Sequence, residues 1–486
     1  MFEEIDVNEP IGLDDYESED HLSADVAALR AEAAGLAPRL AGRTVWMVNS
    51  TSQGGGVAEM MPKLVSLLGE VGVRCRWGVI RSDRAAFFAL TKRIHNMLHG
   101  QEGGSLDAQD RALFECVNRR NGNDLRGMLA PGDIVVIHDP QPLALGAFLK
   151  AEHGVITIFR SHIGLERETP STEAAWAFLK PYAAVVFTAD AYAPSFLASR
   201  AVTIRPSIDP WSHKNRDLTP HKLMGVLCNA GLQRAAQPMV TPPFDHQAMR
   251  MGNAEGHPSV DAIEDIGLLY RPIVTQVSRW DRLKGFHPLL LAFVRLKERR
   301  MRGAILPGDR HARRIELLRL VLAGPDPSSI QDDPDAQDVL HSLTTSYAKL
   351  SPELRRDIAI ISLPMQSRKE NALIVNAIQR CSTLIVQNSI EEGFGLTATE
   401  AMWKRGTVLG TRAYGLCCQI RDGMDGLLTK NPEDPEEIAN HLDMLLSDGA
   451  RRELMGNAAQ RRVHAESLVF SQVAAWLRLF TRCIHS

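Results

Sequence analysis

Two glutamates flank a Gly-Phe-Gly turn in the stretch SIEEGFGLTATEAMW, residues 389–403, where seven residues separate Glu392 from Glu400. A helix is expected to begin near Leu396, and the first N–H groups of a helix have no partner within it, so the amides of 395–397 are expected to face a phosphate. Glu392 is placed to accept hydrogen bonds from sugar hydroxyls, and Glu400 from the two hydroxyls of a ribose. The stretch therefore predicts one nucleotide sugar held at both ends. The alternative is a capped helix with an exposed glutamate.

A second segment, VSRWDRLKGF at 277–286, brings two cations to the turn between a predicted strand and a predicted helix. Arg279 and Lys284, together with the helix N-terminus, suit a diphosphate that has no metal ion to neutralise it. Ordinary surface charge is the alternative for this segment taken alone.

Three glycines in NSTSQGGGVAEM, at positions 54–56, lie between a predicted strand and a predicted helix. Glycine allows a ligand to approach the backbone closely and lets helix N–H groups point at an anion. The segment is not a Walker A loop, because no Gly-Lys-Ser/Thr follows, and it does not match the Gly-x-Gly-x-x-Gly pattern of nicotinamide-binding sites. A tight turn with only a structural role is the alternative.

Composition excludes several classes of protein. The 486 residues carry Lys+Arg 55 against Asp+Glu 58, a formal net charge of -3, so no basic field indicates nucleic acid. The seven cysteines include no Cys-x-x-Cys pair, so neither a zinc ribbon nor a disulfide framework is indicated. The acidic N-terminus lacks the apolar region of a signal peptide, and no run of 18 apolar residues predicts a membrane span. We expect a cytoplasmic protein.

Strands and helices alternate along the chain, which is typical of a doubly wound parallel sheet. Short β-rich runs that end in polar residues predict strands at 44–50, 74–80, 133–140, 155–162, 183–189 and 201–210, and again at 271–280, 318–324, 357–364, 382–389 and 406–412. Apolar residues at helical spacing predict helices at 24–41, 57–72, 142–150, 173–181, 286–299 and 465–483, and one that begins near 396.

The break in this alternation predicts two Rossmann-like α/β domains, 1–265 and 266–465. We expect residues 466–486 to form a C-terminal helix that could pack back on the first domain. Residues 1–20 are expected to be a mobile acidic extension, 211–262 a long irregular insertion and 298–314 a solvated basic loop.

Ligands of open parallel sheets bind at the carboxyl ends of the strands. Polar residues of both predicted domains lie at such ends, and two facing sheets would bring them to one cleft. They are Gly54–Gly56, His138, Asp139, Arg160, His162, Arg279 and the 389–400 loop.

These motifs together resemble the retaining glycosyltransferases of the GT-B fold, in which two Rossmann-like domains face an interdomain cleft. Within that class, the chain resembles the glycosyltransferring trehalose synthases and, closely related to them, the trehalose phosphorylases. The resemblance covers roughly 44–228 and 270–430. It is carried by VNSTSQGGGVAEMM, FFALTKRIHNMLHG, HDPQPL, FRSHIG, PSIDPWSHKN, VSRWDRLKG and EEGFGLTATEAMWK. The chain departs from the usual family pattern at Gly164, where aspartate is usual, and at Tyr414-Gly415-Leu416, where a Gly-Gly-Ile run is usual.

The resemblance implies a role for each matching residue. His162 would contact the donor glucose near its reacting carbon, Arg279 and Lys284 would stabilise the leaving diphosphate, and Glu392 would read the glucose hydroxyls. The implied donor-binding residues are Gly55, Gly56, Ser278, Gly393, Phe394, Gly395, Leu396, Thr397 and Glu400. Asp139, Gln141 and Arg160 are the acceptor-binding candidates.

The activity that this implies is transfer of glucose from a nucleoside-diphosphate-glucose to glucose, with retention, to form α,α-trehalose. No cofactor or metal is expected, because no Asp-x-Asp loop is present where one would be needed. A phosphorylase, or a retaining glucosyltransferase with another small sugar or polyol acceptor, is the alternative; a non-catalytic sugar-nucleotide sensor is a third. The implied partners are the nucleotide sugar and a small sugar acceptor, with no nucleic acid or membrane, and a homodimer is possible. Whether the base is adenine, uracil or guanine stays open.

Overall fold

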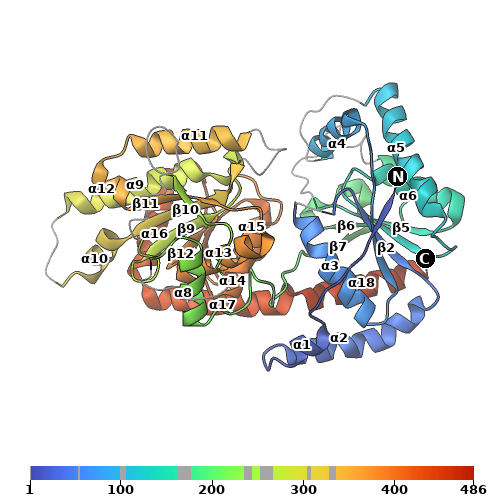
Figure 1. Ribbon diagram of the computed structural model, residues 1–486, viewed down its shortest axis with the longest axis horizontal. Helices are drawn as coiled ribbons and strands as arrows, with labels where there is room; N and C mark the ends of the chain where they lie inside the picture. Colours follow the sequence, from blue (N-terminus) through green and yellow to red (C-terminus); the bar gives the residue numbers. More distant parts are fainter. Residues whose placement is uncertain are drawn as a thin grey trace. The chain divides into compact units, whose positions relative to one another are not determined.

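The computed structural model describes residues 2–52, 55–98, 106–162, 177–234, 243–251, 266–303, 308–327 and 335–485. The chain forms two compact units (Figure 1): Met1–Ser207 with Ser467–Ser486, and Ile208–Glu466. The two predicted α/β domains are therefore present, but the first ends at Ser207 and not near residue 265. No helix in the described ranges is long and apolar enough to cross a membrane.

The first unit is built on a seven-stranded sheet in the order β1-β3-β2-β4-β5-β6-β7. Every neighbouring pair is parallel except β1 with β3. The strands are β1 (Glu3–Ile5), β2 (Val45–Asn49), β3 (Cys75–Val79), β4 (Ile134–His138), β5 (Ile156–Arg160), β6 (Ala184–Phe187) and β7 (Ala201–Thr203). β2 and β4 are completely buried, which explains why both read as continuous apolar runs.

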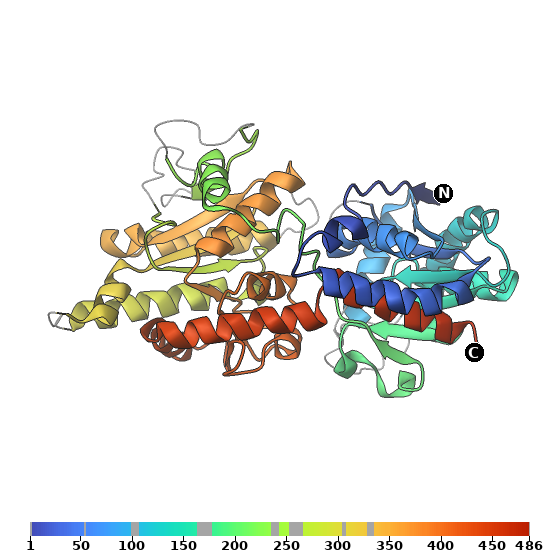
Figure 2. The ribbon, with the colours of Figure 1, turned by 90° about the horizontal axis from the view of Figure 1, so that it is seen from below.

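Helices cover this sheet. They are α1 (Leu13–Glu17), α2 (Ser23–Leu36), α3 (Gly55–Glu70), α4 (Ala85–Leu98), α5 (Ala108–Arg126), α6 (Leu143–His153) and α18 (Val469–Cys483). The last helix of the chain, α18, lies beside α2 near the start of the chain (Figures 1 and 2). Its Trp476 and Phe480 are fully buried, and its Gln472 accepts a hydrogen bond from Ser207 at 2.9 Å. The amphipathic C-terminal helix thus completes the core of the first unit.

The second unit also has a seven-stranded sheet, in the order β14-β13-β12-β9-β10-β11-β8, with only β8 antiparallel to its neighbour. The strands are β8 (Met249–Met251), β9 (Ile273–Val277), β10 (Arg319–Pro325), β11 (Ile358–Leu363), β12 (Leu384–Val386), β13 (Val408–Thr411) and β14 (Leu427–Thr429). Alternate residues of the central strands enter two separate hydrophobic clusters: Leu320 and Leu322 belong to one, Val321 and Ala323 to the other. This sheet is therefore buried on both faces.

The helices of the second unit are α8 (Pro220–Asn229), α9 (Phe286–Arg302), α10 (Arg310–Leu317), α11 (Asp335–Ala348), α12 (Pro352–Arg356), α13 (Arg368–Cys381), α14 (Leu396–Trp403), α15 (Tyr414–Gln419), α16 (Pro435–Ser447) and α17 (Gly449–Glu466). α9, α11 and α16 bury their apolar faces in the first cluster, and α8 and α13 in the second. The helix expected from about 396 is confirmed as α14.

Several expectations about irregular regions were wrong. The acidic residues 1–20 are not a mobile extension, because Glu3 and Glu4 lie on β1 and form ion pairs with Arg81 and Arg76 at the edge of the sheet. The described parts of 211–262 contain α8 and β8, which belong to the second unit.

The remaining corrections concern short segments. The strand expected at 201–210 ends at Thr203, and the basic run 298–314 contains the end of α9 and the start of α10. The helix expected at 173–181 falls partly outside the described residues; the described part includes a single 3-10 turn, Ala177–Leu179.

Candidate active site

The turn after β9 places the first cation of the second unit. A 3-10 turn at Arg282–Lys284 follows the strand, and its N-cap Asp281 accepts a hydrogen bond from the N–H of Leu283 at 2.9 Å. Gly285 then takes the left-handed conformation, φ 60°, and a Cβ atom there would lie 2.1 Å from the carbonyl oxygen of Asn388. Only glycine therefore fits at the point where this turn meets the end of β12.

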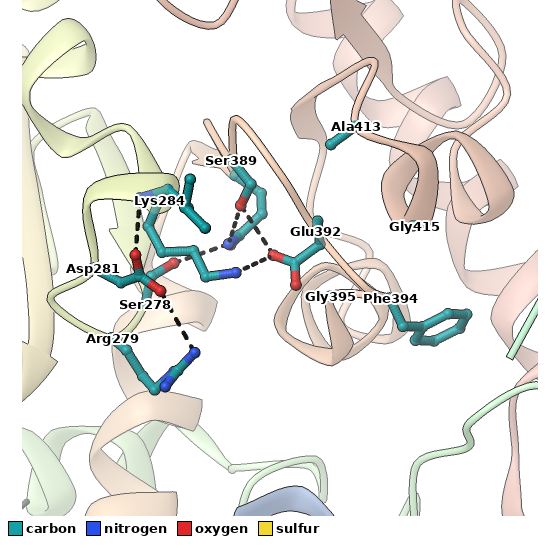
Figure 3. Close-up of polar contacts among 12 residues, drawn as sticks. Ser278, Arg279, Asp281, Lys284, Ser389, Glu392, Phe394, Gly395, Ala413 and Gly415 are labelled. Atoms are coloured by element: carbon teal, nitrogen blue, oxygen red, sulfur yellow. Dashed lines mark hydrogen bonds and ion pairs between the residues drawn. The ribbon is translucent and has the colours of Figure 1, made fainter. Parts of the chain in front are cut away.

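Lys284 and Glu392 form a shielded ion pair. The Lys284 Nζ lies 2.8 Å from Glu392 Oε2, and the two side chains are only 12% and 11% exposed. Ser389 Oγ donates to the same carboxylate oxygen at 2.9 Å (Figure 3). The sequence predicted both residues as ligand contacts, and the structure shows that they are also each other's partner. Because an ammonium has three N–H donors and a carboxylate has two oxygens, a ligand can contact either group while the pair persists.

Arg279 lies apart from that pair. Its side chain is 63% exposed, and a guanidinium nitrogen lies 3.6 Å from an oxygen of Asp281 (Figure 3). Ser278, the preceding residue, is buried and accepts a hydrogen bond from Gln387 at 2.9 Å. The two predicted cations therefore differ, since Lys284 is fixed and shielded whereas Arg279 extends into solvent.

The Gly-Phe-Gly turn leads into α14 as expected. Gly395 has φ 90° and is the N-cap of α14, which has no side-chain cap. A Cβ at Gly395 would lie 3.0 Å from Leu416 and 3.1 Å from Glu392, so the turn is closely packed as well as left-handed. The first N–H groups of α14, at Leu396 and Thr397, are left to a ligand or solvent.

The short helix α15 supports this turn from the other side. The N–H of Gly415 donates to the carbonyl of Glu392 at 3.0 Å, and a Cβ at Gly415 would lie 2.5 Å from that oxygen. Gln419 donates to the carbonyls of Phe394 and Gly395. Of the departing Tyr414-Gly415-Leu416 run, the glycine that this contact requires is retained.

Glu400 lies on α14 and is only 7% exposed. Its Oε1 atom lies 3.6 Å from Nζ of Lys214, which is in the segment that begins the second unit. Lys404, the C-cap residue of α14, donates to Gln379 at 2.8 Å and to the carbonyl of Glu400 at 3.0 Å, and burial lowers its pKa to about 7. Glu400, the residue predicted to bind the ribose, is therefore a shielded carboxylate with a lysine beside it.

The predicted residues of the first unit gather at the ends of β4 and β5. Asp139 follows β4 with a left-handed φ of 64°, which is uncommon for a residue other than glycine. Its Oδ1 atom accepts a hydrogen bond from the backbone N–H of His162 at 3.2 Å. Burial raises the pKa of Asp139 to about 6. This carboxylate thus ties the end of β4 to the residue that follows β5.

His162 is joined to His138, the last residue of β4. The distance from His138 Nδ1 to His162 Nε2 is 2.9 Å. Burial, with the nearby Arg160 cation as a second cause, lowers the pKa of His138 to about 3 and that of His162 well below its usual value. Both imidazoles are therefore neutral at physiological pH.

Arg160, a predicted acceptor-binding residue, has a structural role in the first unit. Its side chain is completely buried and donates to the carbonyl oxygens of Phe187 and Ile204 at 2.9 and 2.7 Å. Burial lowers its pKa to about 9. A guanidinium used in this way joins the strand ends and influences the histidines. Its Nε and Nη2 atoms are buried and have no hydrogen-bond partner among the described residues, so its contact with an acceptor sugar stays a prediction. Sequence could not reveal the structural role, because burial of the end of β5 depends on its neighbours.

Gln141 and the glycines complete the predicted set. The Oε1 atom of Gln141 is buried and has no hydrogen-bond partner among the described residues, so it is suited to receive a ligand hydroxyl. Gly55 begins α3, and at Gly56 a Cβ would meet nothing within 4 Å. Packing among the described residues therefore does not require a glycine at 56.

No group of three or more His, Cys, Asp or Glu side chains that could hold a metal ion occurs in the described ranges. Two contacts were missed in the sequence, His138 with His162 and Lys214 with Glu400. His138 lies in HDPQPL and Lys214 in PSIDPWSHKN. Both segments carried the family resemblance, which was the available signal for these two residues.

Comparisons with known proteins identify the family of the chain. Residues 47–194 match the family model "Trehalose synthase, N-terminal domain", and residues 267–462 match "Glycosyl transferases group 1". A trehalose synthase from Pyrococcus horikoshii is 32% identical over 452 residues, which cover 91% of this chain and 90% of that protein. The chain belongs to the trehalose synthase family of group 1 glycosyltransferases.

Further members of the family support this assignment. A trehalose synthase from Rubrobacter xylanophilus is 30% identical over 92% of both chains. A trehalose phosphorylase from Pleurotus pulmonarius is 27% identical over 89% of this chain, which spans 56% of that longer protein. The family resemblance read from the sequence is thus confirmed, and the activity is hexosyl transfer related to trehalose.

Solved structures confirm the GT-B fold. An α,α-trehalose-phosphate synthase (UDP-forming) from Burkholderia xenovorans superposes with a TM-score of 0.64 over 92% of this chain and 100% of that one, at 15% sequence identity. At that identity the likeness concerns the fold and not the substrates.

Proposed function

We propose that the protein transfers glucose from a nucleoside-diphosphate-glucose to glucose, with retention of configuration, and so forms α,α-trehalose. The observation that carries the proposal is the shielded Lys284–Glu392 pair beside the uncapped N-terminus of α14. A cation and a sugar-reading carboxylate held this close suit a diphosphate and the hexose attached to it. The trehalose synthases among its relatives support the choice of product.

The proposed chemistry is electrostatic. The acceptor hydroxyl attacks the anomeric carbon from the face that the diphosphate leaves, and a departing phosphate oxygen takes the acceptor's proton. Lys284, Arg279 and the N–H groups of α14 stabilise the negative charge that grows on the leaving group. Because these groups supply positive charge, we propose that no metal ion is needed.

The other residues bind and orient the two sugars in this proposal. Glu400 accepts hydrogen bonds from the ribose, and Gly55 and Gly56 give the phosphates access to the backbone. His162 contacts the donor glucose, and Asp139 and Gln141 hold the acceptor. Arg160, being buried, acts by keeping the ends of β5, β6 and β7 together.

Product analysis tests the proposal. The protein is incubated with ADP-, UDP- or GDP-glucose and a panel of acceptors, and the products are identified by proton NMR. We expect an α,α-linked disaccharide with glucose as the acceptor. A β-anomeric product, or transfer only to acceptors other than glucose, would contradict the proposal.

A trehalose phosphorylase is the second candidate, because three fungal phosphorylases are 26–27% identical to the chain over 89% of its length. It differs in one measurable respect, since phosphate would then be a substrate. Incubation with trehalose and phosphate, without nucleotide, would release glucose 1-phosphate from a phosphorylase and would leave a synthase idle.

A further inference from the structure

The two histidines at the ends of β4 and β5 meet edge to edge. Their ring centroids lie 5.3 Å apart and their planes are inclined by only 17°. With His138 Nδ1 2.9 Å from His162 Nε2, the rings are nearly coplanar and share one hydrogen bond between ring nitrogens. Only one of the two nitrogens can carry the shared proton when both rings are neutral.

The second ring nitrogen of His138, Nε2, decides which histidine carries the shared proton. His138 Nε2 lies 3.4 Å from the sulfur of Met47 on β2. A thioether has no proton to donate and accepts only weakly, so an unprotonated Nε2 would set lone pair against lone pair. His138 is therefore protonated at Nε2, and its Nδ1 is the acceptor. The shared proton then belongs to Nε2 of His162, which leaves Nδ1 of His162 without a proton.

The surroundings keep this state fixed. His138 is fully buried, and Trp476 of α18 packs near its ring at a centroid distance of 6.3 Å. Burial lowers the pKa of both rings, and the Arg160 cation, the second cause, also disfavours a second proton on either ring. Asp139, the other titratable group here, contacts His162 only through the backbone N–H in the described structure. Neither ring is therefore expected to change charge near neutral pH.

We propose that His138 is a positioning residue that holds His162 in the Nε2–H tautomer, so that His162 Nδ1 accepts a hydrogen bond from a hydroxyl of the substrate sugar. No described residue donates to that atom, and the backbone contact with Asp139 fixes the position of His162. The proposal rests on the function proposed above, in which His162 contacts the sugar. It adds the direction of the bond, because the sugar has to donate.

Two amide substitutions of His138 separate this role from packing. In His138→Asn the side-chain oxygen can take the place of Nδ1 and accept from His162, whereas in His138→Gln the longer side chain carries its amide toward Met47. Glutamine is closer to histidine in volume. If His138 acts only by packing, His138→Gln should therefore retain more activity; if it acts by its hydrogen bond, His138→Asn should retain more. We expect His138→Asn to retain most of kcat/KM and His138→Gln to lose about tenfold, the size of effect of one hydrogen bond. The opposite order would overturn the proposal.

Nitrogen-15 NMR of the imidazoles reads the tautomer without any assay of activity. In the whole protein, labelled on histidine, we expect His162 to show a protonated Nε2 and a bare Nδ1. His153, at the end of α6, serves as the control, and His153→Asn identifies its signal. A His162 protonated at Nδ1, or at both nitrogens, at pH 7 would overturn the proposal.

The two experiments also distinguish failure of this inference from failure of the proposed function. If the wild-type protein transfers no glucose to any acceptor, the proposed function fails, yet the spectrum still decides the tautomer. If transfer occurs, deoxyfluoro donors test the direction of the bond, because fluorine cannot donate. We expect fluorine at the contacted position to be as harmful as hydrogen; if fluorine restores normal kcat/KM where hydrogen does not, His162 is a donor and the inference is wrong.

Discussion

Replacing Asp139 by asparagine should stabilise the first unit while it weakens activity. Burial raises the pKa of this carboxyl from 3.8 to about 6. At 1.36 kcal/mol for each pH unit, ionisation of Asp139 in the folded state therefore costs about 3 kcal/mol at neutral pH. Asparagine is neutral, tolerates the left-handed φ of 64°, and keeps an oxygen for the N–H of His162.

The size of this stabilisation depends on pH. Between pH 3.8 and about 6 the unfolded chain has lost the proton of Asp139 while the folded protein still binds it. Stability contributed by this group therefore falls as pH rises through that window. His138 contributes in the opposite direction, because its folded pKa of about 3 lies below 6.5. The difference between variant and wild type isolates Asp139, and it should be near zero at pH 4 and largest above pH 7.

Thermal unfolding measures this difference. In a unit of this size each kcal/mol moves Tm by roughly 2–4 °C, so Asp139→Asn should raise the Tm of that transition by about 6–12 °C at pH 7.5 as an upper bound. Because the two units need not unfold together, the transition has to be assigned to the first unit. The fluorescence of variants whose tryptophans all lie in one unit makes this assignment. Asp139→Asn should also transfer glucose poorly, since the acceptor sugar loses a charged partner.

Asp133 provides the matched control. It lies just before β4 and accepts hydrogen bonds from the backbone N–H groups of Thr44 and Ala130 at 2.7 and 2.9 Å. Asparagine has one acceptor oxygen in place of two, so Asp133→Asn should lower Tm. A rise in Tm for Asp139→Asn that is the same at pH 4 and pH 7.5, or no rise at all, would refute the reasoning.

Three further expectations concern donor binding and the need for a metal ion. Lys284→Ala should lower kcat by about 10²–10³ and raise the donor KM much less, because its charge stabilises the leaving group in the transition state; a near-normal kcat in steady-state kinetics would show that Lys284 only anchors the donor. Glu400→Ala should weaken binding of nucleoside diphosphate measured by calorimetry, at roughly 1.5–3 kcal/mol for each charged hydrogen bond lost, whereas Lys214→Met, which frees the carboxylate, should not weaken it; equal affinity of Glu400→Ala and wild type would refute the placement of the ribose. Activity should persist in excess chelator, and loss of activity that magnesium restores would contradict the metal-free proposal.

Local sequence determined the elements and named most of the residues of the candidate site. The alternation of apolar runs and helical spacing predicts both parallel sheets, because each strand and helix buries a face that its own side chains define. The turn at 393–395 was also readable, since Gly395 adopts the left-handed conformation that glycine favours and a helix begins directly after it. Lys284 and Glu392 could be named for the same reason, as each lies in the loop that follows a predicted strand.

Only the tertiary structure decided what surrounds those residues. The end of β5 is buried by its neighbours, so Arg160 donates to carbonyl groups of two other segments. The C-terminal helix joins the first unit, and the acidic start of the chain is held by Arg76 on β3 and by Arg81 just after it, because long-range packing supplies their partners. The proton of His162 is the clearest case, since it depends on the sulfur of Met47, 91 residues away from His138 in sequence. No local pattern encodes such a contact, because strand pairing brings the residues together.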